Sequence, residues 1–408
     1  MTIEQGADHG LPPWWSRTEV VGPWFDVGTD QVRLLRDGVE AFPAMLDAIS
    51  KAEKEILLEM YWVGDDSVGT RFRDALAERA KRGVVVRVIY DSVGSLSMND
   101  AFWTPLRAVS GEVREFHPLS PLRPSFELAN IEHRDHRKIL AVDGKLAFTG
   151  GINLARAWLP VEDGGEAWRD DMIEIRGPAV QELRTLFYKT WRRVWFQRPL
   201  RGAGSTGLPN LAAMKLPRDL APLSKKPAGR VYVLASLRRS RRNLVREYVT
   251  RINRAMTSIE IANSYFIPDR NVRNALFRAV LRGARVRVLV PSKSDVAVVQ
   301  FALEAMYDQL LKKGIEIYCY SGPMMHAKTA VIDDRFSMVG SYNLDERSRR
   351  KNLEVNVAVE DAAFAVYVRE WFDRDVAKAR RMDLYEWRSR PLARRGIEYL
   401  AYALRKLW

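Results

Sequence analysis

Two stretches of this chain carry the same pattern of residues, the first over 136–143 and the second over 326–333. Each reads His-x-Lys, then mostly apolar residues, then Asp. Each is followed at the same spacing by a small-residue turn and an asparagine, Asn153 or Asn343. Side chains at i and i+2 of a strand point to the same face. We therefore expect each His and Lys to project together from a strand, with a hairpin that returns the Asn beside them.

The elements before each motif also repeat, in the order helix, strand, helix, strand. Apolar spacing and glycine positions predict helices over 42–52 and 67–82, strands over 56–62 and 84–90, and then helices over 244–256 and 269–282 with strands over 259–262 and 286–290. Gly83 and Gly283 follow the second helix of each set, where glycine commonly ends a helix. The chain is therefore built from two repeats.

Strands that alternate with helices predict an α/β fold, and the hairpins add antiparallel pairs. We expect two tandem repeats, each a mixed, largely parallel sheet flanked by helices. They would pack about a pseudo-twofold axis with the site at their interface. The expected organisation is an aromatic arm (1–30), a first domain (31–199), a linker or lid (200–230), a second domain (231–382) and a basic amphipathic tail (383–408).

The two ends of the chain allow two interpretations each. Trp14, Trp15, Trp24 and Phe25 fit either an arm packed on the body or an aromatic anchor at a membrane interface. The tail from 391 fits either a helix docked on the body or a basic amphipathic helix lying in the headgroup region. A long helix is expected over 361–381.

The chain has 408 residues and a formal net charge of +14, which points to an anionic partner, either nucleic acid or an acidic membrane surface. Its single cysteine, Cys319, cannot form an intramolecular disulfide and lies in an alternating strand pattern typical of core. No run of apolar residues is long enough to predict a membrane span. No zinc-type spacing or carboxylate cluster predicts a metal, and we expect no cofactor.

Two histidines, two lysines and two asparagines brought together would form a pocket for an anion such as a phosphodiester. One neutral histidine can attack phosphorus, while the other, protonated, gives its proton to the leaving alcohol. Lysines and amides would cover the charge on the phosphate oxygens. The candidate catalytic residues are His136, Lys138, Asp143, His326, Lys328 and Asp333, with Asn153 and Asn343 as phosphate-binding groups. Asp143 and Asp333 fit a structural role in the turn after each strand better than contact with substrate.

Two acids follow the motifs at matching places, Asp170 and Glu354. We expect each to accept a hydrogen bond from an imidazole and so to fix its tautomer. The alternative is an exposed salt-bridge partner. His9, His117 and His133 have no counterpart in the other repeat and are interpreted as incidental.

These residues resemble the phospholipase D superfamily with its duplicated HxKxxxxD motif, over roughly residues 30–380. The segments 168–170, 175–180, 261–268, 340–348 and 352–354 resemble bacterial cardiolipin synthases of the type without N-terminal transmembrane helices. The resemblance implies His136 as nucleophile, His326 as acid/base and Ser341 as a further phosphate-binding residue. Gly151 departs from the pattern, since many relatives carry Ser there. If that hydroxyl binds phosphate, the first repeat lacks one contact.

The resemblance implies a phosphatidyl transferase that makes cardiolipin from phosphatidylglycerol and a second phospholipid through a phosphohistidine. Its expected place is the cytoplasmic face of the bacterial inner membrane, as a peripheral protein on anionic phospholipid. A lipid hydrolase of the phospholipase D type is the alternative. A nuclease is less favoured, although the arginine cluster at 238–242 could meet nucleic acid phosphates. A non-catalytic membrane-binding protein is disfavoured because both motifs are intact.

Overall fold

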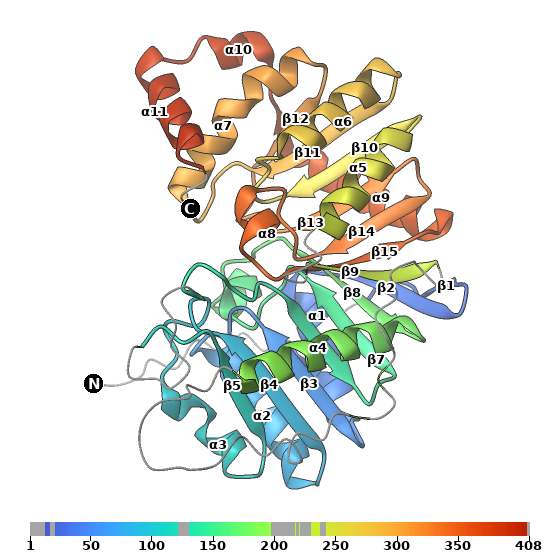
Figure 1. Cartoon of the computed structure of the whole chain (residues 1–408), viewed down its shortest axis with the longest axis vertical. Helices are drawn as coiled ribbons and strands as arrows, with labels where there is room; N and C mark the ends of the chain where they lie inside the picture. Colours follow the sequence, from blue (N-terminus) through green and yellow to red (C-terminus); the bar gives the residue numbers. More distant parts are fainter. Residues whose placement is uncertain are drawn as a thin grey trace.

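The computed structural model describes residues 13–16, 21–120, 130–196, 217, 220, 230–236 and 242–405. Two lobes lie one above the other along the long axis of the molecule, and each is built on one eight-stranded sheet (Figure 1). The expected linker over 200–230 lies almost wholly outside the described residues, as does the arginine cluster at 238–241. Whether that segment is a linker or a lid stays an open prediction, as do the domain boundaries given above.

The strands of the two sheets follow each other in corresponding orders. The first sheet runs β1-β2-β8-β7-β6-β3-β4-β5, with β1 Phe25–Val27, β2 Asp30–Arg36, β3 Glu55–Met60, β4 Val85–Asp91, β5 Glu112–Phe116, β6 Lys138–Val142, β7 Leu146–Gly150 and β8 Asp171–Arg176. The second runs β16-β12-β11-β10-β13-β14-β15-β9, with β9 Val231–Ala235, β10 Ser258–Asn263, β11 Arg285–Pro291, β12 Glu316–Tyr320, β13 Lys328–Ile332, β14 Phe336–Gly340, β15 Val355–Val359 and β16 Ala379–Arg381.

The mixed character of the sheets is as expected, but they are not largely parallel. Parallel pairing is confined to β3-β4-β5 in the first sheet and β10-β11-β12 in the second. The other pairs are antiparallel, and they include the tight hairpins into which each motif strand turns back. The hairpins β6-β7 and β13-β14 are those expected from the sequence, except that β6 and β13 begin at the lysine, two residues after the histidine.

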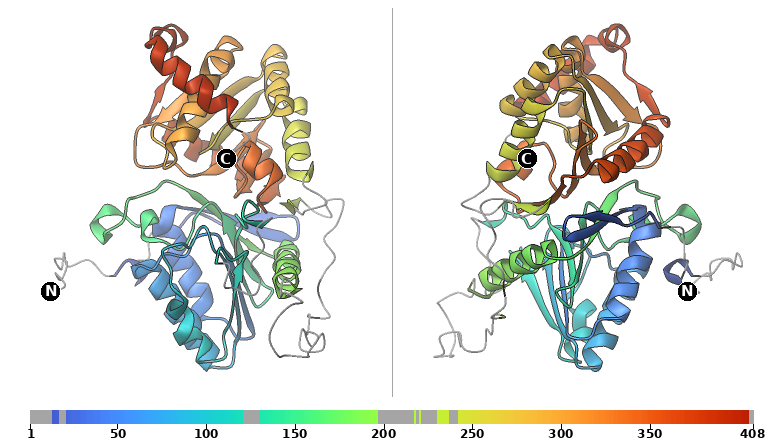
Figure 2. Two further views of the ribbon diagram at one scale, coloured as in Figure 1. Left: turned by 60° about the vertical axis from the view of Figure 1, so that its left-hand side comes forward. Right: turned by 90° about the vertical axis from the view of Figure 1, so that its right-hand side faces the viewer.

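Helices cover both faces of each sheet. Figure 2 shows α4 on one face of the first sheet and α1 and α2 on the other. The helices of the first lobe are α1 Asp37–Ser50, α2 Ser67–Lys81, α3 Thr104–Arg107 and α4 Ala179–Phe196; those of the second are α5 Arg242–Arg254, α6 Arg270–Leu281, α7 Ala297–Lys312, α8 Glu346–Arg350, α9 Ala362–Val376, α10 Leu384–Arg388 and α11 Leu392–Ala403. Asp269 caps α6 as predicted, and Gly83 and Gly283 follow α2 and α6 with positive φ.

The long helix expected over 361–381 ends early, at Val376. Residues Ala379–Arg381 instead form β16, which pairs antiparallel with the edge strand β12. The apolar spacing used for the prediction stops at Val376, and the residues beyond it find backbone partners on an open sheet edge. Cys319 is buried in β12, as its strand pattern predicted.

The lobes share an apolar core. One cluster of buried side chains contains residues of the first sheet and α4 together with Val331, Val357 and Phe364 of the second lobe. Such continuous burial holds the two sheets in one arrangement, since separation would expose apolar area at about 25 cal/mol per Å².

The described parts of both ends pack on the body. Trp14 is buried against Phe42 of α1, and Trp24 lies under the guanidinium groups of Arg33 and Arg176. This favours the packed-arm interpretation for these residues. At the other end, α11 packs along α7 and buries Glu398. None of the helices in the described ranges has the length and apolar character to cross a membrane.

Candidate active site

Each motif histidine lies against a segment of the other lobe. The backbone N–H of His136 donates to the carbonyl of Leu353 at 2.9 Å, and its Nδ1 donates to Oε2 of Glu354 at 3.0 Å. In the second motif, the N–H of His326 donates to the carbonyl of Arg169 at 2.7 Å, and its Nδ1 donates to Oδ2 of Asp170 at 2.7 Å. The two pairs occupy corresponding places in the repeats. The structure therefore forms the expected imidazole–acid hydrogen bonds, and it forms both of them across the interface.

These bonds determine which nitrogen of each ring faces the pocket. A carboxylate can only accept, so Nδ1 of each neutral imidazole carries the proton and Nε2 keeps its lone pair. Both histidines are almost fully buried and line one cavity of about 350 Å³. The site thus presents two Nε2 atoms, one from each repeat, to a common space.

The two lysines are held by different partners. Lys138 donates to the carbonyl of His136 at 2.7 Å, and its ammonium lies 4.9 Å from the centre of the Tyr61 ring. Lys328 also donates to the carbonyl of its own histidine, and to Oγ of Ser264 at 2.9 Å. Tyr61 and Ser264 follow corresponding strands, β3 and β10. The two halves of the site are therefore similar in charge but different in shape.

The asparagines line the pocket with their amide orientation determined by the protein. Oδ1 of Asn153 accepts from the N–H of Trp62 at 3.1 Å, and Oδ1 of Asn343 accepts from the hydroxyl of Ser264 at 3.1 Å. Ser264 donates there because an amide oxygen can only accept, while its own oxygen accepts from Lys328. With both amide oxygens engaged, the NH₂ groups are the ends suited to donate to a phosphate oxygen.

Ser341 differs from the expectation that it binds phosphate. It is fully buried, and its hydroxyl donates to Oε2 of Glu354 at 2.5 Å. Ser348 and Asn352 donate to the other carboxylate oxygen, at 2.7 Å and 3.3 Å. Ser341 therefore positions the acid that orients His136. The sequence pattern placed the Ser341 hydroxyl next to the substrate. The side chain of Glu354, which is longer than that of Asp170 in the other repeat, reaches this hydroxyl and accepts its hydrogen bond.

In the first repeat, the corresponding acid, Asp170, is held by different donors. At Gly151, which corresponds to Ser341, an added Cβ would lie 2.1 Å from Oδ1 of Asp170. The shorter aspartate occupies the space that a serine would need. Its Oδ2 instead accepts from the indole N–H of Trp158 at 3.1 Å, and its Oδ1 from the N–H of Asp171 at 2.8 Å. The absent hydroxyl is thus compensated by an indole.

Burial and like charge govern the protonation of the site. Burial, opposed by the charge of Glu354, lowers the pKa of His136 to about 4, and burial also lowers that of His326. Burial lowers the pKa of Lys138 to about 7 and that of Lys328 to about 8, and each lysine depresses the pKa of the histidines further. A phosphodiester anion in the pocket stabilises every positively charged form and so raises these pKa values.

Asp143 and Asp333, counted among the candidate catalytic residues, lie at the far end of the motif strands. Asp143 accepts from the N–H groups of residues 53–55 at 2.8 to 2.9 Å. Asp333 accepts from the N–H groups of residues 256–258 at 2.8 to 3.1 Å. Both have positive φ, near 55°, at the turn of their hairpin. They hold the loop before β3 or β10 and do not line the pocket, which agrees with the structural role favoured by the sequence.

Several pocket residues were not singled out as functional from the sequence. Five of them are aromatic, namely Tyr61, Trp62, Trp158, Trp168 and Tyr265, and others are charged. The rings of Trp158 and Trp168 both pack on His326, at centroid distances of 5.6 and 5.7 Å. The repeat could have identified Tyr61, Trp62 and Tyr265, because they follow corresponding strands directly. No comparable signal marked Trp158.

The arrangement can bind an anion, attack it with a neutral imidazole and protonate a leaving group with a second one. Aromatic rings form part of the cavity wall beside these groups, and charged side chains, among them Asp295, Asp345 and Arg347, form another part. Within the described ranges, no cluster of His, Cys, Asp and Glu side chains has metal-binding geometry. His117 and His133, by contrast, bond to backbone carbonyl groups outside this pocket. His9 lies outside the described residues.

The chain is similar to known proteins in both its sequence and its fold. A family model described as cardiolipin synthase, phospholipase D-like domain, matches residues 45–191 and 248–376. The chain is 35% identical to the major cardiolipin synthase of Bacillus subtilis over 363 residues, which cover 89% of this chain and 72% of that protein. It is 32% identical to a cardiolipin synthase of Geobacillus thermodenitrificans over 380 residues, 92% of this chain and 72% of that protein.

Among solved structures, phosphatidylserine synthase of Haemophilus influenzae aligns with a TM-score of 0.68 at 15% identity. The alignment covers 92% of this chain and 93% of that one. At this identity the likeness concerns the fold alone. It extends over both lobes.

Proposed function

The chain belongs to the cardiolipin synthase family of phospholipase D-like proteins, and on that premise we propose that it transfers a phosphatidyl group to the hydroxyl of phosphatidylglycerol, producing cardiolipin. The observation that carries the proposal is the shared pocket, into which two carboxylate-oriented histidines face from opposite lobes. Asn153 and Asn343 line it with donors for a phosphodiester, and the buried ammonium groups of Lys138 and Lys328 bond to the carbonyls of the two histidines.

In the first step, Nε2 of His136 attacks the phosphorus of the donor phospholipid. The P–O bond to the leaving alcohol breaks, and His326, protonated on Nε2, gives its proton to that alcohol. We assign the nucleophile to His136 by family resemblance, and a pKa lowered to about 4 keeps its ring neutral at pH 7. Nδ1–H bonded to Glu354 stabilises the positive charge that develops on the ring.

In the second step, the hydroxyl of phosphatidylglycerol attacks the phosphohistidine. The neutral His326 takes the proton of that hydroxyl, the P–N bond breaks, and His136 regains its lone pair. Acid and base are the same group in the two steps, and Asp170 holds it in one orientation throughout. The aromatic wall of Tyr61, Trp158 and Trp168 disfavours water as the acceptor.

We place the enzyme at the surface of an anionic phospholipid membrane, as a peripheral protein. Helix α11 supports this placement, since Leu392 and Leu400 are 77% and 61% exposed. Arginines flank these residues, and Arg405, directly after the helix, lines the catalytic pocket. An apolar face with nearby cations fits a membrane whose headgroups are negative. The cytoplasmic face of the bacterial inner membrane is the location that this function implies.

The test is turnover of phosphatidylglycerol vesicles by the purified protein, with products identified by mass spectrometry, beside His136→Ala and His326→Ala. Cardiolipin formed by the wild-type protein and lost in both variants is the expected result. Phosphatidic acid as the exclusive product would assign a hydrolase instead. Lipid left intact together with cleaved DNA in a parallel assay would assign a nuclease, and unchanged activity in both variants would remove the histidines from the mechanism.

A further inference from the structure

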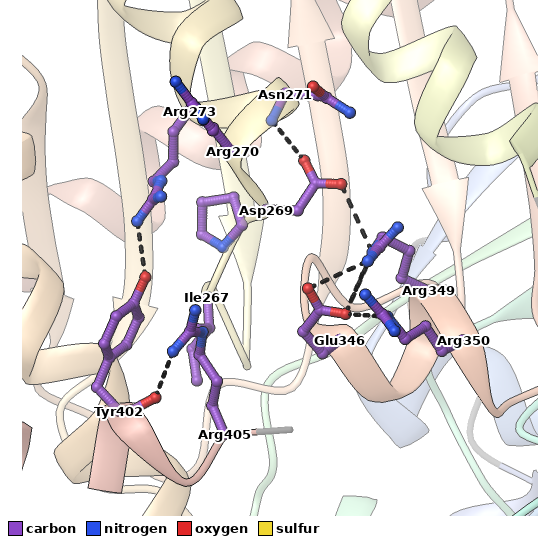
Figure 3. Close-up of a pocket in the computed structure, with 11 residues that line it drawn as sticks. Ile267, Asp269, Arg270, Asn271, Arg273, Glu346, Arg349, Arg350, Tyr402 and Arg405 are labelled. Atoms are coloured by element: carbon purple, nitrogen blue, oxygen red, sulfur yellow. Dashed lines mark hydrogen bonds and ion pairs between the residues drawn. The ribbon is translucent and has the colours of Figure 1, made fainter. Parts of the chain in front are cut away.

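A second cavity lies beside the catalytic pocket in the second lobe, between α6, α8 and the end of α11 (Figure 3). Its volume is also about 350 Å³, and it shares Ile267, Glu346 and Arg405 with the lining of the catalytic pocket. Nothing in the mechanism above uses it. We call it the arginine pocket, because its lining includes Arg270, Arg273, Arg349, Arg350 and Arg405.

The carboxylates of this pocket do not balance its arginines. Asp269 and Glu346 face the five guanidinium groups. Glu346 accepts from Arg349 at 2.9 Å and pairs with Arg350 at 2.6 Å, and Asp269 lies 3.6 Å from Arg349. Both carboxylates therefore lie on the same side of the pocket, next to Arg349 and Arg350, as Figure 3 shows. Asp269 also caps α6, so the N–H groups at that helix end are already bonded.

On the opposite side the guanidinium groups have neutral partners. Arg273 donates to the hydroxyl of Tyr402 at 2.7 Å, and Arg405 donates to the carbonyl of Tyr402 at 2.7 Å while it lies 3.9 Å from the centre of that ring. These contacts orient the two side chains without compensating their charge. Planar guanidinium groups held in this way match the oxygens of a phosphate, often with two hydrogen bonds each.

We propose that the arginine pocket binds a phosphate group, that of an anionic phospholipid headgroup which docks beside the catalytic pocket. The exposed apolar residues of α11 lie next to it in the chain, so a headgroup bound here would have its acyl chains at the face that we assign to the membrane. The identity of the ligand as a lipid rests on the proposed function. The phosphate chemistry of the pocket does not.

The first experiment uses inorganic phosphate, titrated calorimetrically into the full-length protein. Arg270 is exposed and Arg273 has a neutral partner, so Arg270→Gln with Arg273→Gln removes two cations from the side of the pocket away from Glu346. The matched control is Arg285→Gln with Arg381→Gln, two arginines near Glu316 at the opposite end of the second sheet. We expect the pocket variant to weaken one class of phosphate site by about tenfold or more and the control to resemble wild type. Equal isotherms for the two variants would overturn the proposal.

The second experiment separates lipid from free phosphate, using vesicles of phosphatidylcholine with and without phosphatidylglycerol. A lipid headgroup site predicts about 10- to 30-fold weaker binding of the pocket variant to the anionic vesicles, with the control variant unchanged and phosphate as a competitor. Loss of phosphate binding with unchanged vesicle binding would assign a site for soluble phosphate and overturn the lipid assignment. Both assays measure binding, so a failure of the proposed transferase activity, read from products, is separate from a failure here.

Discussion

Nδ1 of His136 in the first repeat donates to Oε2 of Glu354 in the second at 3.0 Å, although 218 residues separate them in the chain. The equivalent bond from His326 to Asp170 runs in the opposite direction across the same interface. Neither repeat therefore contains both a motif histidine and the acid that this histidine bonds to. Each lends the acid that orients the histidine of the other, so the geometry of the site depends on the docking of the two lobes.

The first prediction concerns Glu354. Glu354→Gln keeps the size of the side chain but removes the negative charge that stabilises a positive His136 ring. We expect kcat to fall about 10²- to 10⁴-fold. The measurement is cardiolipin formation under saturating lipid, with Glu112→Gln, a partly exposed carboxylate on β5, as the control. Unchanged kcat in a folded Glu354→Gln protein would remove the acid from the mechanism.

The second prediction compares two tryptophans that pack on the same histidine. The indole N–H of Trp158 donates to Asp170, whereas that of Trp168 donates to Glu166, which lies outside the pocket. Trp158→Phe should lower kcat and shift its pH profile, because Asp170 loses a donor and holds His326 less firmly. Trp168→Phe should leave the pH profile in place. Identical profiles for the two variants would show that Trp158 only fills space.

The third prediction concerns pH. Burial lowers the pKa of Lys138 to about 7 and that of Lys328 to about 8, so the free enzyme loses these positive charges as pH rises through that range. Anion binding should weaken accordingly, and KM should rise between about pH 7 and 9 while kcat changes less, because the bound phosphate raises both pKa values. KM measured across this range checks the expectation. Flat KM values would contradict the lysine assignment.

The fourth prediction separates stability from chemistry at Asp143. Its carboxylate accepts three backbone N–H bonds at the start of β3, far from the pocket. Asp143→Ala should lower the free energy of unfolding by about 1 to 3 kcal/mol, since those donors lose their partner. The kcat of the folded fraction should stay within about twofold of wild type. Chemical denaturation and activity on the same sample provide both values.

The fifth prediction tests the membrane face. Replacing Ile397 and Leu400 of α11 by Asn removes exposed apolar side chains and should reduce binding to phosphatidylglycerol vesicles by about tenfold. Leu281→Asn is a matched control, because that leucine is 86% exposed at the end of α6. Activity towards a short-chain, soluble phosphodiester should persist in both variants. Equal vesicle binding by both would place the membrane contact elsewhere.

Much of the architecture could be predicted from the sequence because it depends on local periodicity. The strand that begins at Lys138, the glycine after α2 and the cap at Asp269 all follow from side-chain spacing and backbone preference within a few residues. Because the chain contains two repeats, the main sequence patterns occur twice, which strengthened each prediction. The prediction was wrong where a partner distant in sequence decides the outcome, as at β16, which exists because β12 offers an open edge.

The sequence by itself determined which groups we propose for the chemistry: two His-x-Lys motifs, the asparagines after them and the two acids downstream. The tertiary structure alone decided how they are paired. Ser341 positions Glu354, Trp158 compensates for Gly151, and each acid serves the histidine of the opposite repeat. The physical reason is that strand periodicity fixes the side to which a residue points, whereas a hydrogen bond across an interface depends on how two whole sheets pack.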